Sequence, residues 1–279
     1  MMKLGDRIKS YYEDRYRINL PRRTNTIIRV DGKGFKNYTR GMERPFDHGL
    51  IKDMNQTAIY LCENIMGAKL AYVASDEISI LITDYDDITT HAWFDNNLQK
   101  MASIAASLAT AKFNQLRMVR FAKNNVDKDD SIASLILNQT MNLEEIENFK
   151  LAMFDARVFQ IPYQEEVINY FHWRQQDATR NSISSVAQSL YSHKELNGKK
   201  TDEMQEMIFQ KGINWNDYTP REKRGSIIKR SIEKRNNEKG DEYERSRWEA
   251  DPETPIFSQN RDYLKSLFPN GNPKDTTAS

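Results

Sequence analysis

The sequence has almost no cysteine and no excess of charge of either sign. Cys62 is the single cysteine in 279 residues, which excludes a disulfide framework and fits a reducing compartment. Lysine plus arginine (41) nearly equals aspartate plus glutamate (40), so binding to nucleic acid would need a local basic patch. No apolar run approaches a membrane span, and the first residues have no apolar signal-peptide core. These absences predict a cytoplasmic protein without a membrane segment.

Apolar periodicity predicts alternating strands and helices in the first part of the chain. Strands are expected at 26–30, 69–74, 77–83 and 153–161. Helices are expected at 47–67, with Asp47 as the N-cap, and at 93–116. The order strand, helix, strand, strand, helix, strand is that of the ferredoxin-like split βαβ fold. In that fold both helices cover one face of the sheet. Ile28 and Val30 should therefore face the helices, and the other face should stay open.

The second part of the chain has a different pattern. Residues 163–245 look helical with little strand, and the tail GNPKDTTAS has a composition typical of disorder. The predicted fold class is therefore α+β, a βαββαβ sheet plus a mainly helical C-terminal region. We expect a catalytic domain over 1–162, a mainly helical region over 163–250, and a partly disordered extension over 251–279.

Two aspartates are placed where this fold would bring them together. Asp31 ends the first strand, and Asp76 lies in the hairpin that leads into the third strand, which is its neighbour in the sheet. Two carboxylates and the carbonyl of Gly32 are hard oxygen ligands of the kind that magnesium prefers. Two magnesium ions there could clamp the oxygens of an in-line phosphoryl transfer. An Asp-Gly pair is nevertheless more often a simple turn, and the residues alone leave both interpretations open.

Basic residues occur at the glycine-rich loop and again near the C-terminus. In GKGFK the backbone N–H groups could form a nest for a triphosphate, with Lys33 and Lys36 adding charge. A second group comprises Arg174, Arg180 and the run at 221–239, which contains Lys223 and Arg224. Such a run is often only a solvated face, but here it surrounds apolar residues and follows an aromatic segment. A contact surface for a phosphate backbone is therefore a reasonable alternative to a merely solvated face.

Several motifs, taken in order, resemble the tRNA-histidine guanylyltransferase family. They are RVDGKGF, AYVASDEISILI, FDARVFQIP, WRQQDATRNS and EMIF…NWNDYTPREKRGSII, within residues 5–230. The chain is most similar to the guanylyltransferase-like branch of bacteria and archaea. The resemblance implies a polymerase-palm-like catalytic domain that extends the 5′ end of tRNA in the 3′-to-5′ direction. ATP would first adenylylate a 5′-monophosphate, and the 3′-hydroxyl of a nucleoside triphosphate, usually GTP, would then displace AMP.

The resemblance also implies roles for individual residues. Asp31, Gly32 and Asp76 match the ligands of two magnesium ions, and Arg29 and Glu77 match further residues of the catalytic centre. The nucleotide-binding positions are matched by Lys33, Gly34, Phe35, Lys36, Arg44, Asp47, Ser75 and Lys100, besides Asp31, Gly32 and Asp76. The expected tRNA contacts are Arg174, Arg180, Asn181, Lys223 and Arg224. Family members also form dimers of dimers, which predicts a homotetramer.

One departure from the family pattern affects the expected substrate. Eukaryotic members have a His-Ile-Asn-Asn-Leu-Tyr-Asn stretch linked to selection of histidine tRNA, and residues 179–185 here keep essentially Asn181 alone. This favours template-dependent repair of 5′-truncated tRNAs over addition of one guanosine to histidine tRNA. A nucleotidyl cyclase is a further alternative. A non-enzymatic RNA-binding module is disfavoured, because the two central strands lack aromatic residues for base stacking.

Overall fold

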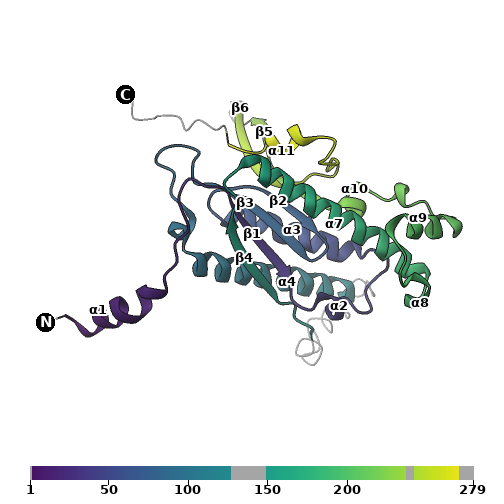
Figure 1. The fold of residues 1–279 in the computed structure, drawn as a ribbon, viewed down its shortest axis with the longest axis horizontal. Helices are drawn as coiled ribbons and strands as arrows, with labels where there is room; N and C mark the ends of the chain where they lie inside the picture. Colours follow the sequence, from purple (N-terminus) through teal and green to yellow (C-terminus); the bar gives the residue numbers. More distant parts are fainter. Residues whose placement is uncertain (1, 127–148, 237–241, 270–279) are drawn as a thin grey trace.

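The computed structural model describes residues 2–126, 149–236 and 242–269. Its centre is a six-stranded antiparallel sheet with the strand order β4-β1-β3-β2-β5-β6 (Figure 1). The strands are β1 (Thr26–Gly32), β2 (Ala68–Ala74), β3 (Glu77–Ile82), β4 (Phe154–Gln160), β5 (Ser226–Asn236) and β6 (Glu242–Ala250). The longer helices are α3 (His48–Asn64), α4 (Leu98–Val126), α7 (Gln164–Leu190) and α9 (Thr201–Gln210). Short helical segments are α1 (Leu4–Ile8), η1 (Lys9–Glu13), η2 (Asp14–Tyr16), α2 (Phe35–Tyr38), η3 (Trp93–Asn96), α8 (His193–Leu196), η4 (Trp215–Asp217), α10 (Pro220–Arg224) and α11 (Arg261–Lys265).

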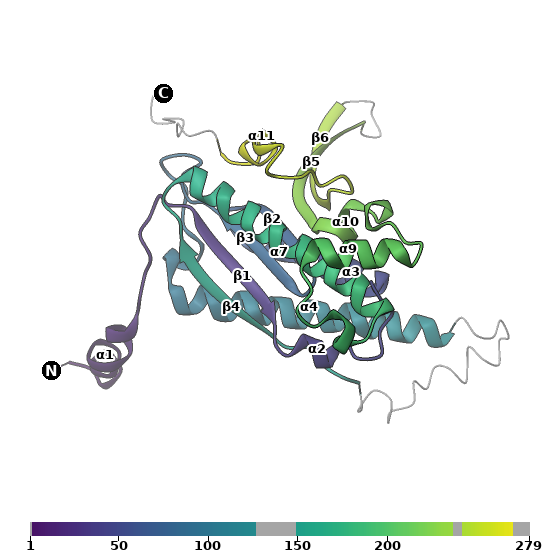
Figure 2. The same ribbon diagram turned by 45° about the vertical axis from the view of Figure 1, so that its right-hand side comes forward.

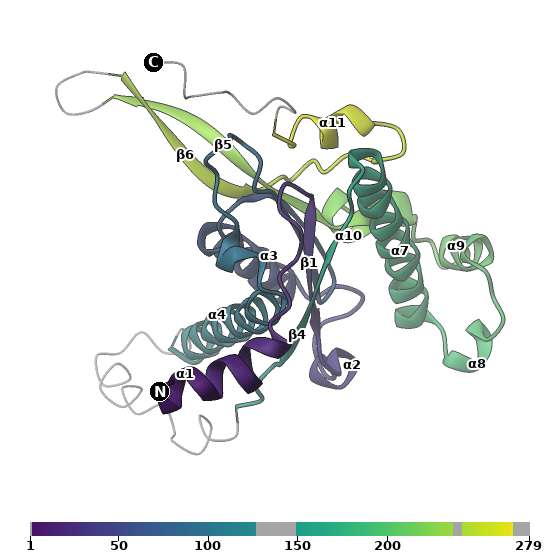
Figure 3. The same cartoon turned by 60° about the vertical axis from the view of Figure 1, so that its left-hand side comes forward.

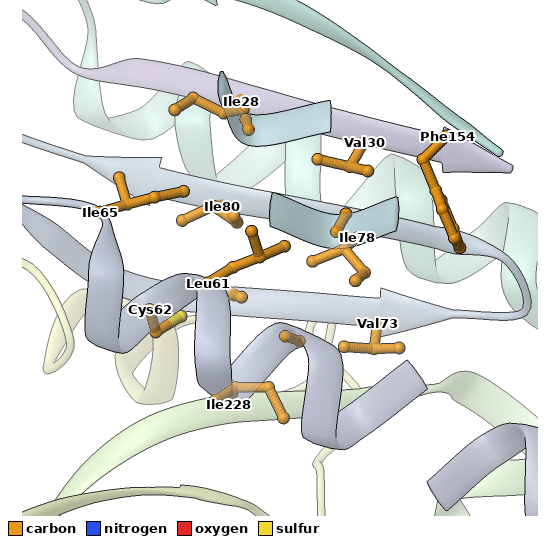
Figure 4. Packing of buried hydrophobic residues seen from close by; sticks show 14 of the residues in the cluster. Ile28, Val30, Leu61, Cys62, Ile65, Val73, Ile78, Ile80, Phe154 and Ile228 are labelled. Carbon is orange, nitrogen blue, oxygen red and sulfur yellow. The ribbon is translucent and has the colours of Figure 1, made fainter. Parts of the chain in front are cut away.

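One face of the sheet is covered by α3 and α4, as the sequence predicted. Ile28 and Val30 are fully buried in one hydrophobic cluster with Leu61 of α3 and Met101 of α4 (Figure 4). Full burial of such side chains contributes about 1.5–3 kcal/mol each, so this cluster fixes the register of the central strands. The strand order β4-β1-β3-β2 is that of the predicted ferredoxin-type fold, and the expected fold class is confirmed.

The expectation of an open second face is wrong over most of that face. α7 crosses it (Figure 2), and Val167 and Phe171 of α7 are fully buried in a second cluster with Ile27 and Leu81 of the sheet. The physical reason is that the strands are apolar on both sides, a pattern typical of strands buried on both faces. The part of this face toward Asp31 keeps polar residues, among them Arg29 of β1 and Arg157 of β4.

The region 163–250 is helical only as far as α10. From Ser226 onward the chain forms β5 and β6, a hairpin that extends the sheet beyond β2 and projects away from its body (Figure 3). Ile227 and Ile228 of β5 are fully buried, one in each hydrophobic cluster. The many charges of the following residues obscured this strand, because on a projecting hairpin both faces can be polar.

Two further segments differ from the prediction. The helix expected from Trp93 is a short turn, η3, in which Phe94 adopts a positive φ, and the regular helix α4 begins only at Leu98. The extension expected after residue 250 is anchored as far as residue 269, since Phe257 and Phe268 pack in the second cluster. Residues 270–279 lie outside the described residues, and they include the whole GNPKDTTAS tail that was expected to be disordered. In the described ranges no helix is both long and apolar enough to cross a membrane.

Candidate active site

A cleft of about 450 Å³ lies at the polar end of the sheet. Its floor is formed by the end of β1 and the β2–β3 turn, and its walls by α3, α7 and the segment around α10. A cavity of this volume is typical of a small-molecule site. The lining includes Asp31, Phe46, Asp47, Leu50, Met54, Asn55, Ser75, Asp76, Glu77, Arg174, Asp177, Asn181, Arg221 and Ser226.

The cleft brings together the two aspartates that the sequence singled out. The N–H of Gly32 donates a hydrogen bond to the carbonyl oxygen of Asp76 (3.2 Å), which ties the end of β1 to the β2–β3 turn. In the sheet Asp31 lies directly opposite Glu77. Burial raises the pKa of the Asp76 carboxyl, and the nearby charges of Asp31 and Glu77 raise it further. A cation bound here would relieve this unfavourable concentration of negative charge.

The donor atoms at this place fit magnesium. Among the described residues no group of three or more histidine, cysteine, aspartate or glutamate side chains is arranged to hold a metal ion. The site instead offers two carboxylates, Asp31 and Asp76, and the nearby backbone carbonyl of Gly32. Magnesium is commonly bound by one or two carboxylates while water and substrate phosphates complete its coordination.

Gly32 and Gly34 of this loop are needed for packing and for backbone conformation. A Cβ on Gly32 would lie 2.2 Å from the ring of Phe35, which is buried in an aromatic cluster with Phe113 and Phe154. Gly34 adopts a φ of +65°, which favours glycine, and a Cβ there would meet nothing within 4 Å. Gly32 is therefore required by the packing of Phe35, and Gly34 by the backbone at the start of α2.

The loop offers a smaller nest than the sequence suggested. The N–H groups of Gly32 and Lys33 donate to the carbonyls of Asp76 and Met153 and are not available to a ligand. Within the described residues, the N–H groups of residues 34–36 have no protein acceptor. Lys33 and Lys36 are exposed and, within the same residues, form no ion pair.

The β2–β3 turn is as tight as predicted. Ser75 and Asp76 alone connect the two strands, and Ser75 adopts a φ of +54°, an uncommon conformation for a residue other than glycine. Such a conformation costs on the order of 1–2 kcal/mol, so the surrounding hydrogen bonds must hold it. The backbone N–H of Asp76 and the Ser75 side chain act to lower the pKa of the Asp76 carboxyl, which burial raises.

Glu77 is neutralised by a neighbour on α7. Arg174 donates two hydrogen bonds to its carboxylate, Nε to Oε1 and Nη2 to Oε2, both 2.8 Å long. Both side chains are only 13% exposed. Arg29 lies further from the same carboxylate, with its Nε 4.0 Å from Oε2. The Nε atom of Arg29 is buried and has no hydrogen-bond partner in the described part of the chain. Glu77 and Arg174 thus form a structural pair, while Arg29 retains an unused donor.

Of three further expected nucleotide-binding residues, Asp47 lines the cleft, whereas Arg44 and Lys100 do not. Asp47 lines the cleft and also caps α3, because its Oδ1 accepts a hydrogen bond from the Leu50 N–H (2.7 Å), as predicted. Arg44 is exposed and absent from the cleft lining. Lys100 lies in the first turn of α4, beside residues that contact the segment leading into β1. It is therefore at the end of the sheet opposite Asp31, and this molecule does not bring it to the cleft.

The expected tRNA contacts are also divided. Asn181 lines the cleft, whereas Arg180 lies on the exposed side of α7 and pairs with Asp177. Lys223 donates to the Asn216 carbonyl (2.5 Å) and Arg224 to the Thr254 carbonyl (2.9 Å). These two cations hold α10 in place, so any contact with RNA would compete with internal hydrogen bonds.

The sequence interpretation missed two features of the cleft. Arg221 is exposed, lines the cleft, and has no ion-pair partner within the described residues. Asn55 of α3 and Ser226 of β5 are buried and hydrogen-bonded to each other (3.4 Å) at the cleft wall. The basic run at 221–239 was the available signal for Arg221. No local signal joined Asn55 to Ser226, because their contact depends on the pairing of β5 with β2.

We expect Arg221→Ala to weaken substrate binding more than Lys223→Ala. Arg221 is exposed at the cleft, where it can meet a phosphate, and a charge-assisted hydrogen bond of this kind is worth about tenfold in affinity. Lys223 already has an internal acceptor and packs over the ring of Trp215. KM values for the triphosphate and for RNA, measured for both variants, test this ranking. A larger effect of Lys223→Ala would contradict this ranking and would show that Lys223 contacts phosphate despite its internal hydrogen bond.

Comparisons with known proteins find similarity over most of the chain. The family model described as tRNAHis guanylyltransferase matches residues 5–162. A bacterial tRNA(His) guanylyltransferase-like protein in complex with ATP is 44% identical, with a TM-score of 0.76 and coverage of 95% of this chain and 99% of that chain. The bacterial structure in complex with GTP is 43% identical, with a TM-score of 0.73 and coverage of 95% and 98%. The tRNA(His) guanylyltransferase of Debaryomyces hansenii is 26% identical over 223 residues, 75% of each chain.

Proposed function

The chain belongs to the tRNA-histidine guanylyltransferase family, a family of nucleotidyltransferases, and we propose that it adds nucleotides to the 5′ end of tRNA in the 3′-to-5′ direction. The observation that carries this proposal is the meeting of Asp31 and Asp76 at one cleft, beside a loop with two exposed lysines. The similar bacterial structures hold ATP and GTP, the two nucleotides that such a reaction needs.

The proposed reaction has two steps. An oxygen of the RNA 5′-monophosphate attacks the α-phosphorus of ATP, the α–β phosphoanhydride bond breaks, and pyrophosphate leaves. The 3′-hydroxyl of the incoming triphosphate then attacks the 5′-phosphorus of the adenylylated end, loses its proton, and displaces AMP. Two magnesium ions held by Asp31, Asp76 and the Gly32 carbonyl would supply positive charge at the attacking and leaving oxygens.

The chain's own groups would position the substrates. Lys33 and Lys36 are exposed beside the N–H groups of residues 34–36, which have no acceptor in the described part of the chain, and this arrangement suits a triphosphate. Asn55 and Ser226 offer hydrogen-bonding groups at the wall, and the apolar side chains of the cleft suit a base. The pair of Glu77 and Arg174 leaves Asp31 and Asp76 as the carboxylates to be neutralised by a cation.

For the substrate we propose 5′-truncated tRNAs, repaired by addition of the nucleotide that pairs with the opposite strand. The support is that residues 179–185 keep only Asn181 of the asparagines linked to selection of histidine tRNA. Addition of a single guanosine to histidine tRNA is the alternative.

We also propose that the protein is a homotetramer in the cytoplasm and that α7 to α10 form the main tRNA-contacting region. The molecular mass in solution, measured by light scattering, tests the tetramer.

The test incubates the protein with magnesium, ATP, the four nucleoside triphosphates and a 5′-monophosphorylated tRNA that lacks its first nucleotide. We expect growth by one nucleotide, and that nucleotide should change when the opposite base of the tRNA is changed. Addition of guanosine regardless of the opposite base, and only to histidine tRNA, would favour the alternative substrate. Cyclic product formed from one triphosphate without RNA would overturn the proposal.

A further inference from the structure

Two arginines lie side by side on the sheet face that α7 crosses. Arg29 of β1 is the cross-strand partner of Arg157 of β4, between an apolar pair, Ile27 and Phe159, and an acidic pair, Asp31 and Asp155. Like charges directly opposite each other in a sheet are destabilising. The repulsion would be relieved by an anion bound between the two guanidinium groups, one residue row away from Asp31.

The hydrogen-bonding state of these arginines favours such an anion. The buried Nε of Arg29 has no acceptor among the described residues, and the nearest carboxylate, Glu77, is already held by Arg174. Arg157 is 54% exposed, and its ion pair with Asp155 is long, at 3.7 Å. One guanidinium is thus buried with an unused donor, and the other is accessible and weakly paired.

An exposed indole lies on α7, the helix that crosses the same face of the sheet. Trp173 of α7 is 51% exposed, and the Arg174 guanidinium packs over its ring at 4.5 Å. Tyr170 connects it to the sheet, because the Tyr170 ring contacts both Trp173 (6.0 Å) and Phe159 of β4 (5.7 Å). The Tyr170 hydroxyl also hydrogen-bonds Ser79, the other cross-strand neighbour of Arg29. The indole is therefore supported by neighbouring side chains on the flank of α7 that faces β4.

We propose that Trp173, Arg157 and Arg29 form a subsite for the 5′-terminal nucleotide of RNA. The terminal base stacks on the accessible part of the Trp173 ring, and the 5′-phosphate is bound by Arg29 and Arg157 beside Asp31. Stacking accepts any base, which suits an enzyme that must hold ends of varying sequence. Arginine is well suited to phosphate because its planar donors match the phosphate oxygens. The inference rests on the proposed function, since it names where the RNA end lies.

The phosphate half of the subsite is tested with RNA that differs only at its end. Full-length protein is titrated with a truncated tRNA carrying either a 5′-monophosphate or a 5′-hydroxyl. Wild type should bind the phosphorylated RNA about tenfold more tightly, and Arg157→Ala should lose this preference. Lys52→Ala is the matched control, because it removes an exposed cation from α3 on the opposite side of the sheet. An unchanged preference in Arg157→Ala overturns the phosphate assignment.

The stacking half is tested with an abasic nucleotide at the 5′ end. Trp173→Ala should raise KM for intact RNA about five- to a hundredfold while KM for ATP stays unchanged, and Trp173→Phe should restore part of it. The abasic RNA should bind wild type and Trp173→Ala equally. Tyr163→Ala, which removes another exposed aromatic residue at the start of α7, is the control. An effect of Trp173→Ala as large on abasic RNA as on intact RNA overturns the stacking assignment.

Two outcomes distinguish a wrong assignment of the subsite from a wrong assignment of the function. If wild type extends RNA but Arg157→Ala and Trp173→Ala leave KM for RNA unchanged, the subsite is wrong and the proposed function stands. If wild type extends no RNA end, the proposed function itself fails. Light scattering on Trp173→Ala gives a further check, because a change in mass would identify Trp173 as a contact between copies of the chain and overturn the RNA assignment.

Discussion

Replacing Asp31 or Asp76 with asparagine will lower the rate of nucleotide addition by about a thousandfold or more. Each change removes a charged oxygen ligand at the place where Asp31 and Asp76 converge. Charge stabilisation by a bound metal is worth several kcal/mol in the transition state, and each 1.4 kcal/mol corresponds to about tenfold in rate. Single-turnover rates on a 5′-triphosphorylated RNA, which needs no adenylylation, isolate the transfer step.

Stability measurements distinguish this loss from misfolding. Burial raises the pKa of Asp76 in the folded protein, so its ionised form costs stability at neutral pH, and this cost is relieved as the pH falls through that pKa. Asp76→Asn removes the cost and should be at least as stable as wild type at pH 7, with the difference in stability shrinking on acidification.

Asp155→Asn is the control for the rate measurement, since Asp155 lies opposite Asp31 but outside the cleft lining. The rate of nucleotide addition by Asp155→Asn should fall less than tenfold. A nearly normal rate in Asp31→Asn or Asp76→Asn would disprove the metal assignment.

Replacing Arg174 with methionine will lower the free energy of unfolding by about 3 kcal/mol, because a poorly exposed carboxylate then loses its partner. Glu77 then keeps the hydrogen bond from the Ser79 hydroxyl (3.2 Å), and the nearest cation that remains is Arg29, whose Nε is 4.0 Å from Oε2 of Glu77. Arg174→Lys should recover only part of the loss, since an ammonium cannot reproduce the two parallel hydrogen bonds. Urea unfolding followed by circular dichroism measures the effect.

A matched arginine on the same helix separates the ion pair from a general effect on α7. Arg180 also pairs with Asp177 but is 66% exposed, so Arg180→Met should change the free energy of unfolding by no more than about 0.5 kcal/mol. Equal stability of Arg174→Met and wild type would mean that the pair with Glu77 makes no net contribution. In that case Glu77 would be available for a direct role in the reaction.

Local patterns were enough to predict the sheet and the convergence of two carboxylates. β1, β2, β3 and β4 lie within two residues of their predicted bounds, because each strand is apolar and flanked by turn residues. The short turn at Ser75 and the cap at Asp47 were also predicted from residue type alone. The meeting of Asp31 and Asp76 then followed from the strand order of the fold.

Features that depend on distant contacts were not predictable in the same way. α7 was recognised as helical, but its position across the sheet depends on the apolar second face formed by Ile27 and Leu81. The strand β5 was concealed by its charges. Gly32 was attributed to the approach of a triphosphate, whereas its contact with the ring of Phe35 is a matter of packing. The internal hydrogen bonds of Lys223 and Arg224 likewise appear only in the folded chain.

The pairing of β5 with β2 has a consequence for the order in which the protein is made. Val73 lies three residues before Asp76 in the sequence, yet its partner on β5 is Ser226, which lies far later in the chain. A ribosome therefore releases both aspartates long before the wall containing Asn55 and Ser226 can close. A nascent chain that ends before β5 carries the two proposed metal ligands without a finished cleft, so we expect nucleotide binding only when synthesis is nearly complete.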